Sequence, residues 1–119
     1  MDKNRNDSQQ NAQHGLWIVN DEAHTLFANE RMAEILGTTQ TDLAQRNSFD
    51  YIYPEDLPAA ERLFRLKTSG NRLPFHFKLR RKDGMPVWVH VQATPMFNVE
   101  GRFTGIVGTF TVAHAEALP

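Results

Sequence analysis

Alternation of apolar and polar side chains marks the second half of the chain. In residues 73–80 phenylalanine and leucine alternate with histidine, lysine and arginine, and residues 87–93 alternate valine and alanine with larger polar or aromatic residues. A period of two places successive side chains on opposite faces of a strand. Turn-forming residues follow at 82–84 and 98–101, and a last strand is predicted over residues 103–112. We therefore expect three consecutive strands with one buried apolar face.

The first part of the chain predicts a short hairpin followed by helices. Residues 15–20 and 25–28 are β-prone segments separated by turn-forming residues. Asn29 stands at a favoured N-cap position, apolar residues then recur at helical spacing, and Gly37 is placed to end the helix. Two further helical turns are expected between residues 41 and 53.

The longest helix is predicted between Pro54 and Gly70. Proline and acidic residues are favoured in a first turn, and a glycine supplies an end signal. Its buried stripe is expected to consist of Leu57, Leu63, Phe64 and Leu66. The order of two strands, several short helices and three strands predicts an α+β domain, in which an antiparallel sheet carries its helices on one face.

Composition narrows the class of protein. Of the 119 residues, 40% are hydrophobic and eight are phenylalanine, which suffices for one core without disulfides or metal. A formal charge of -1 disfavours polyanion binding, and the absence of cysteine rules out thiolate metal sites and cysteine nucleophiles. Basic residues at positions 78 and 80–82 are expected at a solvated hairpin, not on nucleic acid. Lacking a long apolar run, the chain is predicted to be cytoplasmic, without membrane contact.

The predicted domain boundaries follow from where the strand and helix patterns of apolar residues begin and end. Residues 1–14 are largely polar and are expected to be a flexible or partner-dependent helical flank. Residues 15–113 contain every predicted strand and helix and are assigned to one domain. Residues 114–119 have helix propensity and are expected to begin a linker.

Eight short segments, taken in order, resemble the PAS (sensory box) family. Each is weak alone, but together they cover about residues 15–112. The segments are Trp17-Ile-Val-Asn, Phe27-Ala-Asn, Ile35-Leu-Gly, Tyr53-Pro-Glu-Asp, Arg81-Lys-Asp-Gly, Val87-Trp-Val, Thr94-Pro-Met-Phe and Gly105-Ile-Val-Gly. The resemblance implies a PAS fold, which is a five-stranded antiparallel sheet in spatial order 2-1-5-4-3 with short helices on its concave face.

The resemblance also implies a function. PAS domains are sensory and signal-transduction modules that bind a small ligand or dimerise, and they relay to an output domain such as a histidine kinase or diguanylate cyclase. We expect no enzymatic activity in the domain itself, a homodimer, and an output domain in a larger signalling protein. The family usually ends in an Asp-Ile-Thr type segment, and Thr111-Val112-Ala113 stands in that place, which puts this route of output coupling in doubt.

The sequence lacks the residues that two cofactor chemistries of the family require. The light-sensing branch needs a cysteine that adds to flavin, and Ser48 stands in that place. The positions that grip the flavin edge correspond to Leu79, Val89 and Phe110, whose side chains form no hydrogen bonds. The haem-binding branch uses a histidine on the long helix, and residues 54–70 contain none. We expect no cofactor and no metal, while a noncovalent flavin or a small apolar metabolite stays open.

Strand alternation and the helical stripe predict an apolar chamber between the sheet and the helices. The candidate ligand-binding residues are Ile52, Leu63, Phe64, Phe75, Phe77, Leu79, Val89, Val91, Ala93, Ile106, Gly108 and Phe110. Two interpretations stay open. Side chains fill the space as an ordinary packed core, or the small residues Ala93 and Gly108 leave room for an apolar or aromatic metabolite.

The opposite face of the sheet is predicted to carry Trp17, Trp88, His90 and Thr109. Two exposed indoles on one face indicate a covered surface. A second subunit in an isologous contact and the N-terminal flank are the candidate covers, and an incidentally exposed tryptophan in a monomer is the alternative. His76 is expected on this face too, so neither it nor His90 should reach the chamber or bind a metal.

An enzyme is the competing class of function. A small cone-shaped α+β isomerase or dehydratase also combines a curved sheet, helices and an apolar pocket. Its acid and base candidates would be Asp50, Tyr51, Tyr53 and His76. His76 faces away from the pocket by alternation, and Asp50 has no evident buried partner, so we expect no catalytic site.

Overall fold

The computed structural model describes residues 14–113. The predicted linker and, apart from His14, the predicted flank lie outside the described residues, and the domain limits stay a prediction. The elements, in chain order, are β1 (Gly15–Asn20), β2 (Thr25–Ala28), α2 (Glu30–Leu36), α3 (Gln40–Leu43), the 3-10 turns η1 (Ser48–Tyr51) and η2 (Pro54–Asp56), α4 (Leu57–Thr68), β3 (Phe75–Arg80), β4 (Pro86–Phe97) and β5 (Phe103–Val112).

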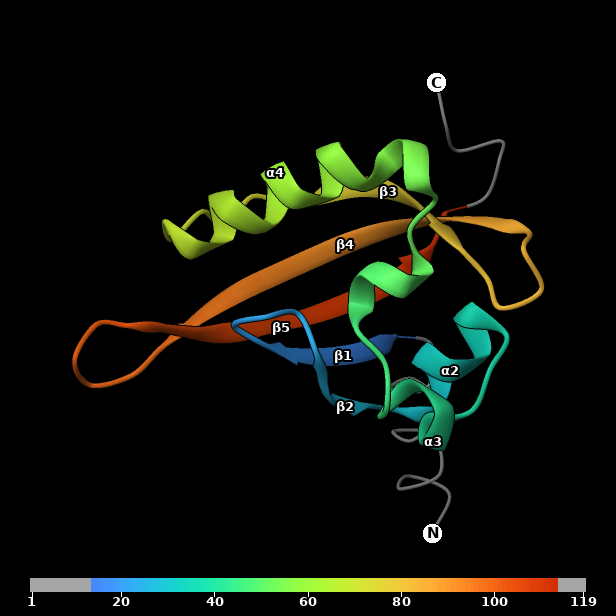
Figure 1. Ribbon diagram of the computed structural model, residues 1–119, viewed down its shortest axis with the longest axis horizontal. Coiled ribbons are helices and arrows are strands. Elements are labelled where there is room, and N and C mark those ends of the chain that lie inside the picture. Colours follow the sequence, from blue (N-terminus) through green and yellow to red (C-terminus); the bar gives the residue numbers. More distant parts are fainter. Residues whose placement is uncertain (1–13, 114–119) are drawn as a thin grey trace, which may run out of the picture.

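The five strands form one antiparallel sheet in the order β2-β1-β5-β4-β3 (Figure 1). β4 and β5 make its long centre, where Ala93 lies opposite Gly108. On the other side of β5, Trp17 of β1 also lies opposite Gly108. β3 pairs with β4 and sets His76 opposite His90. The predicted fold class and strand order are confirmed.

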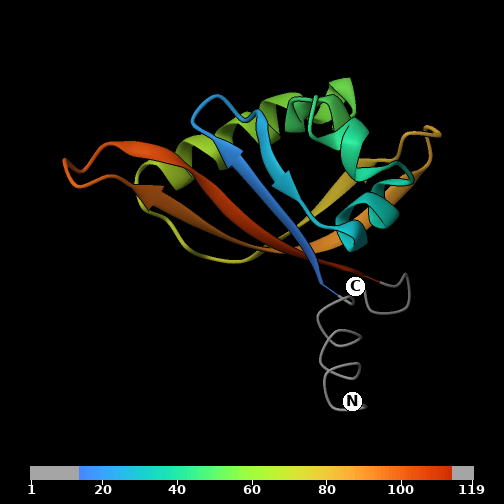
Figure 2. The same ribbon diagram turned by 90° about the horizontal axis from the view of Figure 1, so that it is seen from below.

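The described helices lie on one face of the sheet, which curves around them (Figure 2). α2 packs on β1 and α3 on β2, while α4 lies over β4 on the other half of the sheet. The outer face of the sheet carries no helix from residues 14–113. The two groups of helices thus stand over opposite halves of the sheet, and the space between α4 and the strands is where a site can form.

An asparagine side chain fixes where the first helix begins, and a glycine fixes where it ends. The Asn29 side chain accepts hydrogen bonds from the backbone N–H groups of Met32 and Leu16, so this cap also ties α2 to β1. Gly37 ends the helix in the left-handed conformation, with φ of 69°, which glycine adopts without steric cost. The predicted cap and stop signals are confirmed here.

The most completely buried part of the core is formed mainly by α2 and α3. The largest fully buried side chains are Met32, Ile35, Leu36, Leu43 and Val89. Complete burial of such a side chain contributes about 2 kcal/mol. Most of these side chains therefore support the β1–β2 half of the sheet, whereas α4 contributes only Ala60 and Lys67 as buried residues.

The buried face of α4 differs from the predicted stripe. Leu66 is 50% exposed, whereas Ala60 and Lys67 are buried and Leu63 and Phe64 are partly buried. Positions 60, 63, 64 and 67 follow the i, i+3, i+4, i+7 spacing of one helix face. The prediction for Leu66 was wrong because it followed residue type and not helical phase, and in that phase a lysine occupies the buried position.

Candidate functional site

An apolar chamber of about 120 Å³ lies between α4, η1 and the sheet. The strands supply a continuous apolar floor, and α4 with η1 supplies the roof. The lining residues are Trp17, Val19, Ser48, Phe49, Ile52, Ala60, Leu63, Phe64, Lys67, Phe75, Phe77, Leu79, Val91, Ala93, Ile106, Gly108 and Phe110.

The predicted chamber residues are brought together, with one exception. All of them except Val89 line the chamber. Val89 is fully buried but does not line the space. Alternation identifies the face to which a side chain points, and it cannot tell whether open space remains beside that side chain.

A pair of small residues shapes the floor of the chamber. Ala93 and Gly108 lie directly opposite each other on β4 and β5, and both line the chamber. Larger side chains at this place would project into the chamber, so the pair leaves room beneath α4. The rings of Phe75 and Phe110 line the strands on either side of the chamber floor, and the ring of Phe64 belongs to its roof.

Trp17 was wrongly predicted on the outer face of the sheet. It is 4% exposed and lines the chamber, with its ring centroid 5.8 Å from Tyr51 and 5.7 Å from Phe110. Its indole N–H donates to the Thr25 hydroxyl at 2.9 Å, which satisfies the buried polar group. β1 alternates with Trp17 and Val19 inward, and it is the Phe110 ring that occupies the space a side chain at Gly108 would need.

Besides Trp17, whose indole N–H is bonded to Thr25, two lining residues carry side-chain polar atoms, Ser48 and Lys67. Ser48 begins η1 and lies at the place that the resemblance assigns to the flavin-reactive cysteine. Lys67 belongs to the last turn of α4 and is 3% exposed. Burial lowers the pKa of its ammonium group below the ordinary value. The chamber therefore combines an almost wholly apolar surface with one buried cation.

The outer face carries the other aromatic and histidine residues that were predicted there. Trp88 is 43% exposed, and the exposed rings of His76 and His90 lie in contact across β3 and β4, with centroids 4.7 Å apart and planes tilted by 60°. Thr109 lies opposite Leu16 and Gln92 on the same face. Within residues 14–113, no three histidine, aspartate or glutamate side chains gather as a metal site, and no helix is long and apolar enough to cross a membrane.

The four residues considered as acid or base candidates do not meet in one site. None of them lines the chamber. Asp50 caps the 3-10 turn by accepting from the Asn47 N–H, and the Tyr53 hydroxyl donates to the Gly84 carbonyl. Tyr51 bonds to Asp42, while His76 is exposed on the outer face. The acid–base arrangement that an enzyme of this size would need is not assembled from these residues.

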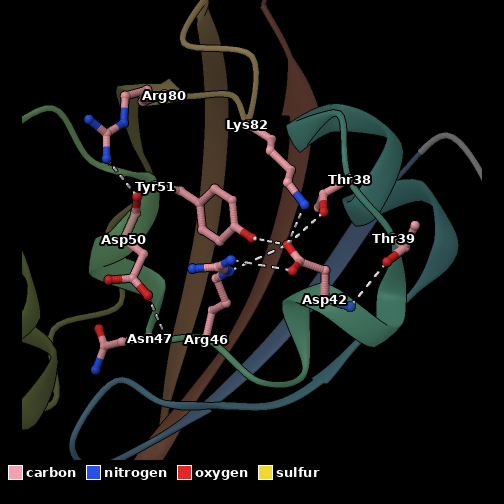
Figure 3. A network of polar contacts seen from close by, with 9 residues as sticks. All are labelled: Thr38, Thr39, Asp42, Arg46, Asn47, Asp50, Tyr51, Arg80 and Lys82. Atoms are coloured by element: carbon pink, nitrogen blue, oxygen red, sulfur yellow. Dashed lines mark hydrogen bonds and ion pairs between the residues drawn. The ribbon is translucent and has the colours of Figure 1, made fainter.

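Asp42 lies at the centre of a polar network that joins α3 to η1 and to the β3–β4 turn (Figure 3). One carboxylate oxygen accepts from the Thr38 hydroxyl at 2.8 Å and from the Tyr51 hydroxyl at 3.3 Å. Arg46 and Lys82 each approach it to 3.4 Å. The Thr38 hydrogen bond, supported by Arg46 and Lys82, lowers the pKa of Asp42 from 3.8 to about 2. Burial and the nearby carboxylate raise the pKa of Tyr51.

The lowered pKa predicts an acid-dependent contribution to stability. Because the folded-state pKa lies below 3.8, the contribution is complete above that value and is lost as the pH falls toward about 2. We expect Asp42→Asn to lower the urea midpoint at pH 7, and the gap from the wild type to shrink between pH 4 and pH 2. Unfolding followed by circular dichroism measures the gap. A gap that stays constant across this range would show that the carboxylate charge is not the stabilising group.

Comparison with known proteins agrees with the geometry of the sheet and chamber. The family model described as PAS fold matches residues 25–110. In a search of curated proteins, the chain is 31% identical over 74 residues to the aryl hydrocarbon receptor nuclear translocator homolog of Drosophila melanogaster. The match covers 60% of this chain but only 12% of the length of that relative.

Solved structures share the fold at low sequence identity. A PAS domain from Colwellia psychrerythraea has a TM-score of 0.77 at 12% identity, covering 93% of this chain and 95% of that one. A sensory box histidine kinase/response regulator from Burkholderia thailandensis has a TM-score of 0.71 at 16% identity, covering 92% and 83%. The chain belongs to the PAS-fold family. It is therefore a domain of the sensory and signalling class, typically a non-catalytic module.

Proposed function

We propose that this domain senses a small, largely apolar molecule bound in the chamber beneath α4 and relays its occupancy to an output domain. The observation that carries the proposal is the chamber itself, which keeps about 120 Å³ free next to Ala93 and Gly108. A dry apolar cavity of about 150 Å³ admits benzene in a well-studied case. The chamber thus suits a ligand with a body of about one aromatic ring.

The lining favours a metabolite over a flavin. A three-ring isoalloxazine is much larger than a benzene-sized body, and its polar edge would need hydrogen-bonding side chains. Leu79 and Phe110 occupy the corresponding part of the wall and supply none. Ser48 faces the chamber but has a hydroxyl in place of the thiol that forms an adduct. Reversible binding without covalent chemistry is the mode that these residues support.

The outer sheet face is the proposed site of homodimerisation. Phe27, Ile18 and Val107 lie in register across β2, β1 and β5, and form an apolar row on this face. Trp88, on β4, adds an exposed indole. Large aromatic side chains are frequent anchors of protein interfaces. Because the sheet forms both this face and the floor of the chamber, a ligand can influence the dimer through the strands.

The setting of the domain follows from the same proposal. A sensor domain acts on an output domain. The similarity to a histidine kinase/response regulator supports a kinase as that output domain, and a diguanylate cyclase is a second candidate. Such outputs act in the cytoplasm, and we place the domain there, as part of a two-component or related pathway.

Ligand binding can be tested by filling the chamber. We expect toluene to raise the melting temperature of the wild type and to shift methyl resonances of chamber residues in NMR spectra, since a ligand that binds only the folded state stabilises it. Ala93→Leu should abolish both effects because its isobutyl group occupies the chamber floor. Thr94→Leu is the matched control, since residue 94 is the next position along β4 and points to the opposite face. Lack of binding by the wild type would identify the chamber as packed core and refute the proposal.

A further inference from the structure

Lys67 is the one charged residue among those that line the chamber. Its side chain is 3% exposed, although lysine is almost never fully buried without a partner. The position is set by helical phase, since Lys67 follows Leu63 and Phe64 at i+4 and i+3 on the buried face of α4. The fold therefore buries a lysine at the edge of an almost wholly apolar space.

The ammonium group is only partly satisfied by the described residues. Its Nζ donates to the Leu73 carbonyl at 3.0 Å and lies 5.6 Å from the centroid of the Phe75 ring. An ammonium has three donors. The ion pairs among residues 14–113 use other cations, and none joins a carboxylate to Lys67. A buried cation without a carboxylate partner is costly to maintain, and the lowered pKa of Lys67 reflects that cost.

We infer that Lys67 binds the carboxylate of a small apolar monocarboxylic acid whose hydrocarbon body fills the chamber. This inference rests on the proposed function and specifies its ligand class. The carboxylate would accept a charge-assisted hydrogen bond from Nζ beside Leu73, and the body would contact Phe64, Phe75 and Phe110. A single cation matches a monoanion, whereas a phosphate dianion would need several donors that the apolar lining does not provide. The size of the chamber indicates an acid with one aromatic ring or a short branched chain.

The experiment compares benzoate with benzyl alcohol, a neutral molecule of similar shape, by calorimetric titration of the full chain. We expect the wild type to bind benzoate about tenfold or more tightly than benzyl alcohol at pH 7. Lys67→Met keeps the length and apolar stem of the side chain, so it should lose the benzoate preference and keep the affinity for benzyl alcohol. Arg65→Met is the matched control, because it removes a cation from the same turn of α4 at an exposed position and should leave both affinities unchanged.

The outcomes separate this inference from the function on which it rests. Equal binding of benzoate by the wild type and Lys67→Met, or a wild-type preference for benzyl alcohol, overturns the inference while the chamber remains a binding site. No binding of either compound by the wild type overturns both. Should Lys67→Met fail to fold, the wild type decides alone, since its benzoate preference must fall as the pH is raised to about 10 and the ammonium loses its charge. A preference that does not change with pH overturns the inference.

Discussion

Gly105→Ala is expected to destabilise the domain by about 3 kcal/mol or more, a large part of the total stability of a small domain. Gly105 lies on β5 opposite Asn20 of β1. A Cβ atom at this position would overlap the backbone carbonyl oxygen of Val19 and press on the Met96 side chain. The carbonyl belongs to a neighbouring strand and cannot rotate away, so β1 and β5 would have to separate locally. Urea unfolding followed by circular dichroism measures the loss.

Gly101→Ala provides the control for this prediction. Gly101 lies in the β4–β5 turn with φ of 83°, and a Cβ atom there would meet nothing within 4 Å. The substitution should cost only the left-handed conformation of a non-glycine residue, about 1 kcal/mol. Similar urea midpoints for the two variants would contradict the proposed collision with β1.

Trp88→Ala is expected to weaken homodimerisation by about 2 kcal/mol or more, which corresponds to about 30-fold in the dissociation constant. The indole is the large aromatic group that β4 presents on the outer sheet face. Its loss removes an anchor from the proposed interface and does not disturb the chamber on the opposite face. Sedimentation velocity over a range of concentrations should show the variant shifting toward monomer.

Phe97→Ala is the matched control for the interface. Phe97 lies at the far end of the same strand and is 42% exposed, almost the same fraction as Trp88, but it packs against Phe103 beyond the bulge in β4. Loss of this ring should leave the dimer unchanged. A wild type that sediments as a monomer at all concentrations, or equal effects of the two substitutions, would refute the proposed interface.

The strands and helices could be predicted from the sequence wherever turn and cap signals coincide with the ends of the apolar pattern. The limits of β1, β2 and β5 match the predicted segments because turn residues bound each of them. Asn29 and Gly37 marked α2 because cap and stop signals depend on the nearby backbone alone. β4 continues past the predicted alternation to Phe97 and includes Pro95. Its pairing with β3 ends at Val91, so Pro95 occupies an edge segment, where its missing N–H is tolerated.

The candidate site was predicted less completely, for reasons that differ between residues. In β1, Leu16 and Ile18 are as apolar as Trp17 and Val19, so alternation of polarity could not identify the inward face. The inward face becomes clear only from the pairing of β1 with β5, in which the Trp17 ring packs against the inward Phe110 ring, and that pairing requires the register of the sheet. Lys67 could have been found by following helical phase along α4. The volume left open depends on how rings and small residues fit together, which no pattern in the sequence measures.

The facing pair Ala93 and Gly108 gives the domain a simple means of divergence. Both residues belong to strands whose ladder bonds come from the backbone, so a change of side chain at Ala93 need not alter the pairing of β4 with β5. A few added carbon atoms there would resize the cavity while the exterior stays the same. Over evolutionary time, substitutions at this one codon could change the size of the molecule that the proposed site admits, or fill the cavity altogether, in descendants of one ancestral domain.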